Sequence, residues 1–141
     1  MKISKGLMLA VAVLFVLNLT ACGSKYSEVE EVMNAQANAM KNYIDAMEQA
    51  ENAQDVVASI NGFTSEMKLL IPRMKEVMSK FPEIADDQSP PEELQAVSEE
   101  MRIQSGKLQG AMMKAMQYMQ DPGVQKAIQD QGRIMMEMAK E

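Results

Sequence analysis

The spacing of apolar residues is the feature that most constrains the fold of this chain. From about residue 27 onward, apolar side chains recur every three or four positions, which places them on one face of a helix. Strands would show β-branched residues alternating with polar ones, and no segment after residue 22 has that pattern. The sequence therefore predicts an all-α protein.

The pattern divides into four segments, and the residues between them are typical of helix ends. Asn52 is suited to cap the second helix, and Ser89 followed by two prolines and two acids is a strong helix start. Short connections favour antiparallel neighbours, so we expect a small antiparallel bundle of about four helices. The predicted helices cover about residues 27–52, 54–80, 91–119 and 122–139.

Pro72 lies inside the second predicted helix. Proline has no backbone N–H and its ring crowds the preceding turn, so it bends a helix that continues through it. The sequence therefore predicts that this helix is kinked at Pro72, with the distortion beginning near Lys68.

Each predicted helix has an apolar face that we expect to form the core. In the first two helices the predicted core residues are Val29, Met33, Ala37, Met40, Tyr43, Ile44, Met47, Val56, Val57, Ile60, Phe63, Met67, Leu70, Ile71, Met74, Val77 and Met78. In the last two they are Leu94, Val97, Met101, Leu108, Met112, Ala115, Met116, Met119, Val124, Ile128, Met135 and Met138.

Composition excludes several classes of chemistry. The chain has no His and a single Cys, which excludes imidazole metal sites, His-dependent nucleophilic catalysis and Cys-rich zinc sites. Its formal net charge of −6 is unsuited to phosphate binding, so we expect no nucleic-acid partner. There is also no Gly-rich phosphate loop. The sequence therefore predicts a protein that is not an enzyme.

The first 22 residues have the layout of a secretory signal. Two lysines precede an apolar stretch that is too short to span a membrane comfortably, and the stretch closes with Leu19-Thr20-Ala21-Cys22. This tetrapeptide resembles the lipobox of bacterial lipoproteins, in which cleavage before the cysteine leaves a diacylglyceryl thioether and an N-acyl group. The resemblance implies that Cys22 is lipidated and becomes the first residue of the mature chain.

The resemblance gives a domain organisation and a location. It implies a signal peptide at 1–21, a lipid-anchored tether at 22–27 and a helical domain at 28–141. Several acyl chains together make a stable membrane anchor. Gly23 and Ser24 differ from the Asp that acts as an inner-membrane retention signal in enteric-type lipoproteins, so we expect the periplasmic face of an outer membrane.

Methionine is unusually abundant, with 16 residues in the chain. One interpretation is a pliable core, because an unbranched thioether fills irregular gaps. A second is a Cu(I) site, because thioethers bind that soft ion without His. A third is a Met-lined cavity or surface for an apolar ligand or a helix. The candidate copper ligands are Met112, Met116, Met119 and Met135.

The third predicted helix also carries apolar and small residues on its back. Gly106 and Gly110 form a step of small residues that lets another helix approach closely, although two glycines weaken a helix interior. Packing within the chain, a partner or self-association surface, and a loose helix with no special role all remain open. The candidate partner-binding residues are Ile103, Gly106, Gly110, Met113 and Met136.

These patterns together predict a lipid-anchored lipoprotein of the bacterial envelope that acts as a non-enzymatic adaptor or accessory protein. Its partner would be an envelope protein or a second copy, bound through helix faces. The alternatives are a Met-rich periplasmic Cu(I)-binding protein and a carrier of an apolar small molecule.

The first prediction concerns the anchor. In cells fed an alkyne fatty acid, the wild-type protein should acquire the label and remain in the membrane fraction. Cys22→Ser should lose the label, because serine offers no thiol for thioether formation. Mature wild-type protein released without lipid into the medium would contradict the resemblance.

Overall fold

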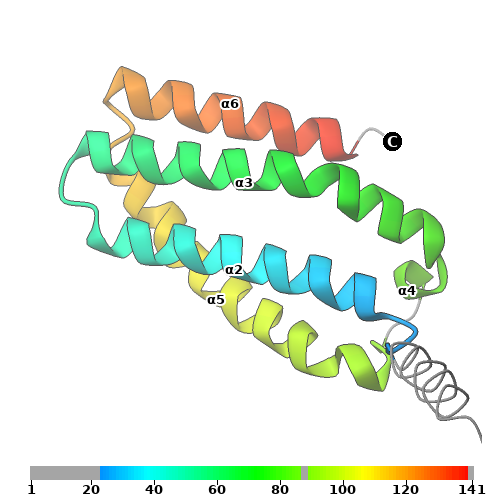
Figure 1. The fold of residues 1–141 in the computed structure, drawn as a ribbon. Helices are drawn as coiled ribbons and strands as arrows, with labels where there is room; N and C mark the ends of the chain where they lie inside the picture. The colour runs from blue at the N-terminus through cyan, green and yellow to red at the C-terminus, as the bar shows by residue number, and fades with distance from the viewer. Residues whose placement is uncertain (1–22, 87–88, 140–141) are drawn as a thin grey trace, which may run out of the picture.

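The computed structural model describes residues 23–86 and 89–139 of the 141-residue chain. Within these residues every regular element is helical (Figure 1), and the predicted all-α bundle with four packed helices is confirmed. The elements are α2 (Ser27–Gln49), α3 (Ala53–Lys80), the short α4 (Glu83–Asp86), the 3-10 turn η1 (Glu92–Leu94), α5 (Gln95–Gln117) and α6 (Pro122–Ala139).

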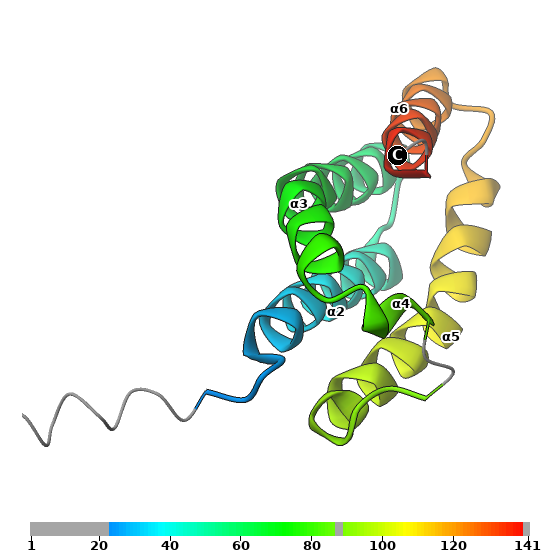
Figure 2. The same cartoon turned by 90° about the vertical axis from the view of Figure 1, so that its right-hand side faces the viewer.

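The four long helices form two hairpins, and the second hairpin lies across the first. Helices α2 and α3 run antiparallel and pack along their lengths, while α5 packs on α2 and α6 packs on α3. Contact between α5 and α6 is slight, and Figure 2 shows them diverging from the turn that joins them. The second hairpin is therefore open, and the first lies between its two arms.

Side-chain caps start α3, as predicted from Asn52, and α6. The predicted cap by Ser89 is wrong, because the third long helix begins with the 3-10 turn η1 after Pro91 and neither η1 nor α5 has a side-chain cap. Asn52 Oδ1 accepts a hydrogen bond from the Asp55 backbone N–H at 3.0 Å, and the Asp55 carboxylate accepts one from the Glu51 N–H at 2.9 Å. Asp121 Oδ1 accepts from the Gly123 N–H at 2.8 Å and from that of Val124 at 3.2 Å. These bonds satisfy N–H groups that a helix start leaves free.

Helix α3 continues through Pro72 as one element of 28 residues. Its ribbon bends in the second half (Figure 1), as expected for a proline that removes one backbone donor. The bend carries the end of α3 toward α4 and the start of α2.

The core between α2 and α3 follows the predicted faces except at Met78, a predicted core residue that is 59% exposed. Met47, Val56 and Ile60 are fully buried, and Met40 and Met67 are nearly so. Met40 and Met47 are seven residues apart in the sequence, a spacing that keeps them on one face of α2. Together with Met67 they fill the seam between the two helices, as the pliable-core interpretation predicts.

The predicted inward faces of α5 and α6 are partly wrong. Met112 and Met116 are 58% and 68% exposed, Met119 is 38% exposed, and Met135 is 46% exposed. Val97, Ala115 and Val124 are buried as predicted, and the other buried residues of these helices are Gln104, Ala111, Ala127 and Ile134.

The exposure of these methionines has a steric cause. Ala111 and Ala115 are small enough to let α5 lie close against α2. With these alanines facing α2, the larger methionines of α5 point away from the core. The buried Gln104 is satisfied, because its side-chain amide donates to Glu100 Oε1 at 2.6 Å.

The second prediction tests the methionine core. Met47→Ala should lower the free energy of unfolding by about 2–5 kcal/mol, because it leaves a cavity at a site with no exposure. Met47→Leu conserves volume and should cost less than about 1.5 kcal/mol. Urea unfolding measures both, and equal costs for the two variants would contradict tight packing at this position.

Candidate functional site

The principal candidate site is a groove of about 420 Å³ lined by all four long helices. We call it the four-helix groove. Its floor is formed by Met40, Tyr43, Phe63 and Met67 from α2 and α3. Its walls include Leu108 and Met112 from α5, with Ile128 and Met135 from α6. The groove exists because α5 and α6 diverge over the hairpin beneath them.

The lining of the groove is apolar and carries no charged side chain among the described residues. Its polar members are Tyr43, Gln36, Ser105 and Gln131. The Tyr43 ring packs on that of Phe63 with centroids 5.0 Å apart, and burial raises the pKa of Tyr43. Because the phenol stays neutral at physiological pH, the groove is suited to the uncharged part of a ligand.

A second cavity, the end cavity, lies between α2 and α3 near α4. Its volume is about 180 Å³, and its lining includes Val29, Met33, Met74, Phe81 and Ile84. Sequence patterns identified these residues as apolar but did not show that they enclose space, because that depends on how α3 bends and where α4 lies.

Several methionines next to the groove are exposed to solvent. The Met surface, as we name it, comprises Met112, Met113, Met116, Met119, Met135 and Met136. Met112, Met113 and Met116 come from the last turns of α5, Met119 from the turn after it, and Met135 and Met136 from α6. Exposed apolar side chains close together in the chain are typical of an interaction site.

The five predicted partner-binding residues are all exposed. Ile103 is 40% exposed, and Met113 and Met136 belong to the Met surface. A Cβ added to Gly106 or Gly110 would meet no other described residue within 4 Å. The alternative that these glycines serve packing within the chain is therefore wrong for the described residues.

The structure brings together only part of the candidate copper set. Met112 and Met135 line the four-helix groove, whereas Met116 on α5 and Met119 in the turn after it are exposed and do not line it. The described part of the chain also contains no cluster of three or more His, Cys, Asp or Glu side chains that could hold a metal ion.

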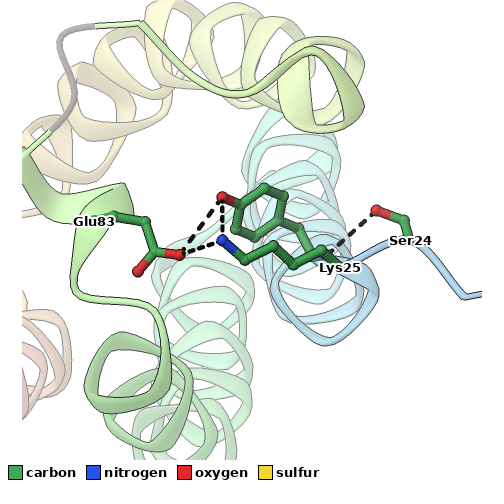
Figure 3. A network of polar contacts seen from close by, with 4 residues as sticks. Ser24, Lys25 and Glu83 are labelled. Atoms are coloured by element: carbon green, nitrogen blue, oxygen red, sulfur yellow. Dashed lines mark hydrogen bonds and ion pairs between the residues drawn. The ribbon is translucent and has the colours of Figure 1, made fainter.

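A polar network holds the first described residues against α4 (Figure 3). Lys25 Nζ lies 2.8 Å from Glu83 Oε1 and 3.0 Å from the Tyr26 hydroxyl. The hydrogen bond to Glu83 raises the pKa of Lys25 and lowers that of Glu83. The Tyr26 ring also packs edge-on against Phe81, at a centroid distance of 5.6 Å. Lys25 and Tyr26, assigned above to the tether, thus contact the folded domain.

The signal peptide and Cys22 lie outside the described residues, as does the side chain of Met138. Among the helices that the structure does describe, none has the length and apolar character needed to cross a membrane. Comparisons with family models, curated proteins and solved structures gave no match for this chain.

The third prediction tests the open space beside the α5 glycines. Gly106→Ala and Gly110→Ala should each raise the free energy of unfolding by about 0.5–1 kcal/mol, because alanine restricts the unfolded chain and meets no neighbour. Thermal or urea unfolding measures the change. A loss of stability in the monomer would show that another part of the chain packs on these positions.

Proposed function

We propose that the protein is a lipid-anchored, non-enzymatic adaptor of the bacterial cell envelope, and that its Met surface binds an apolar helix of another envelope protein. The exposure of that surface is the observation that carries the proposal. Methionine side chains are flexible and polarisable, so a surface made of them adapts to the shape of a partner helix.

The position of the chain start supports this arrangement. Gly23 and the residues after it enter α2 at one end of the domain, far from the turn between α5 and α6, in both views (Figures 1 and 2). An anchor at Cys22 would therefore hold that end of the domain near the bilayer and keep most of the Met surface away from it. A protein partner is then a better fit than the surface of the anchoring membrane.

The chemistry around the Met surface favours a helix as the partner. The exposed glycines at 106 and 110 lie on the same helix as three of these methionines, and small residues let two helices approach closely. Residues 103–120 contain two lysines and no Asp or Glu, so this segment differs from the acidic remainder of the chain. An apolar helix with acidic flanks would match both features.

A non-enzymatic role agrees with the residues of the groove. Its described lining contains no Cys, His, Asp, Glu, Lys or Arg, the groups that supply most nucleophiles and general acids or bases. The proposal therefore assigns the domain binding rather than chemistry.

The fourth prediction tests the partner surface. A photoreactive amino acid placed at Met116 should crosslink in intact cells to one envelope protein. Replacing Met113 and Met136 together with Gln should reduce that adduct several-fold, because an interface depends on its buried apolar contacts.

Leu69 provides the matched control. It is 77% exposed and lies on α3 outside the Met surface. The same photoreactive residue at Leu69 should give no discrete adduct, and Leu69→Gln should leave the Met116 adduct intact. An adduct with twice the mass of the chain would assign the surface to a second copy, and the absence of any adduct would contradict the proposal.

A further inference from the structure

We propose that the four-helix groove and the end cavity form one continuous trough that binds a single acyl chain of a membrane lipid. Gln36 lines both cavities, so they adjoin at this residue. The site lies inside the domain and is distinct from partner binding on the Met surface. The inference therefore goes beyond the proposed function, although Met112 and Met135 border both regions.

The trough is elongated because its lining residues follow one face of α2. On α2 the lining positions are Val29, Met33, Gln36, Met40 and Tyr43, which are separated by three or four residues and so share a face. From the first to the last of them, a rise of 1.5 Å per residue gives a length of about 21 Å. An elongated apolar space of this kind fits an extended hydrocarbon chain better than a compact ring system.

The opposite side of the trough follows α3 in the same way. Phe63 and Met67 line the four-helix groove, and Met74, Val77 and Phe81 line the end cavity. Methionine occurs on both sides, and its flexible side chain adapts to a ligand that has no fixed shape. The lining residues of both cavities include no charged group, so the part of the ligand inside them must be uncharged.

Charged groups border the trough at the α4 end. Val29 and Phe81 line the end cavity, and their sequence neighbours Glu28 and Lys80 form an ion pair of 2.6 Å. Lys25 and Glu83 form a second pair beside Ile84. A lipid headgroup would remain in this polar environment while its acyl chain extends between α2 and α3. The first described residues lie at this same end, where an anchor at Cys22 would bring the membrane close.

The size of the groove argues against a helix as the occupant. A helix with its side chains is about 10–12 Å across and rises 5.4 Å per turn, so one turn would take up the whole 420 Å³. An acyl chain is much thinner and can fill the trough along its length. A partner helix can rest on the Met surface without entering the floor of the groove.

The experiment uses the lipidated full-length protein in phospholipid nanodiscs, with palmitate that carries a photoreactive diazirine on its hydrocarbon chain. After irradiation, mass spectrometry of the digested protein locates the adducts. We expect them on floor residues of the trough, including Met40, Tyr43 and Met67. Adducts confined to the outside of the helices would overturn the proposal.

Two glycine variants separate this site from the partner surface. Gly132 lines the groove with open space around it, so Gly132→Leu should fill the groove and reduce the floor adducts by about tenfold, equivalent to about 1.4 kcal/mol. Gly106 does not line the groove, and Gly106→Leu should leave these adducts unchanged. An added Cβ meets no other described residue within 4 Å at either glycine, and leucine is a better helix former than glycine, so both variants should fold.

The outcomes of the two experiments are distinguishable. Loss of the crosslinked partner in Gly106→Leu with retained palmitate adducts would support both sites as separate features. Floor adducts that persist in Gly132→Leu would overturn the acyl-chain site and leave the partner surface untouched. The absence of floor adducts in the wild-type protein would overturn the acyl-chain site as well.

Discussion

The close approach of α5 to α2 is the contact on which the rest of the structure depends. Ala111 and Ala115 are buried where these helices meet, and small side chains let two helix backbones come near each other. This contact turns Met112 and Met116 away from the core and moves α5 apart from α6. The Met surface and the four-helix groove are therefore two consequences of the same choice of packing face.

The sequence predicted the first hairpin better than the second. In α2 and α3 the large apolar residues form broad stripes, so the face with Met40, Met47 and Met67 was unambiguous. In α5 the methionines occupy adjacent faces, and the sequence analysis placed several of them in the core because they are large and apolar. The structure buries the smaller Ala111 and Ala115, of which only Ala115 was predicted. The contact face depends on the surface that α2 offers, and no local pattern in α5 encodes that surface.

The candidate site, too, could be predicted from the sequence only in part. Exposure of Ile103 and Met113 followed from helical geometry alone, because they lie opposite the predicted stripe. The two cavities could not be predicted, because each requires residues from helices that are distant in sequence. Ser105 illustrates this limit: a polar residue in a helix gives no sign that it borders an apolar groove.

The contact between the chain start and α4 has a mechanical consequence. Lys25 and Tyr26 attach the segment nearest the expected anchor to Glu83 and Phe81. Few backbone bonds then remain between the anchor and the folded domain about which the domain could rotate. A pulling force exerted by a bound partner would then be transmitted through α2 and α3 to the membrane with little slack. With an anchor at Cys22, the domain would follow the movement of the anchor closely instead of rotating freely about a flexible linker.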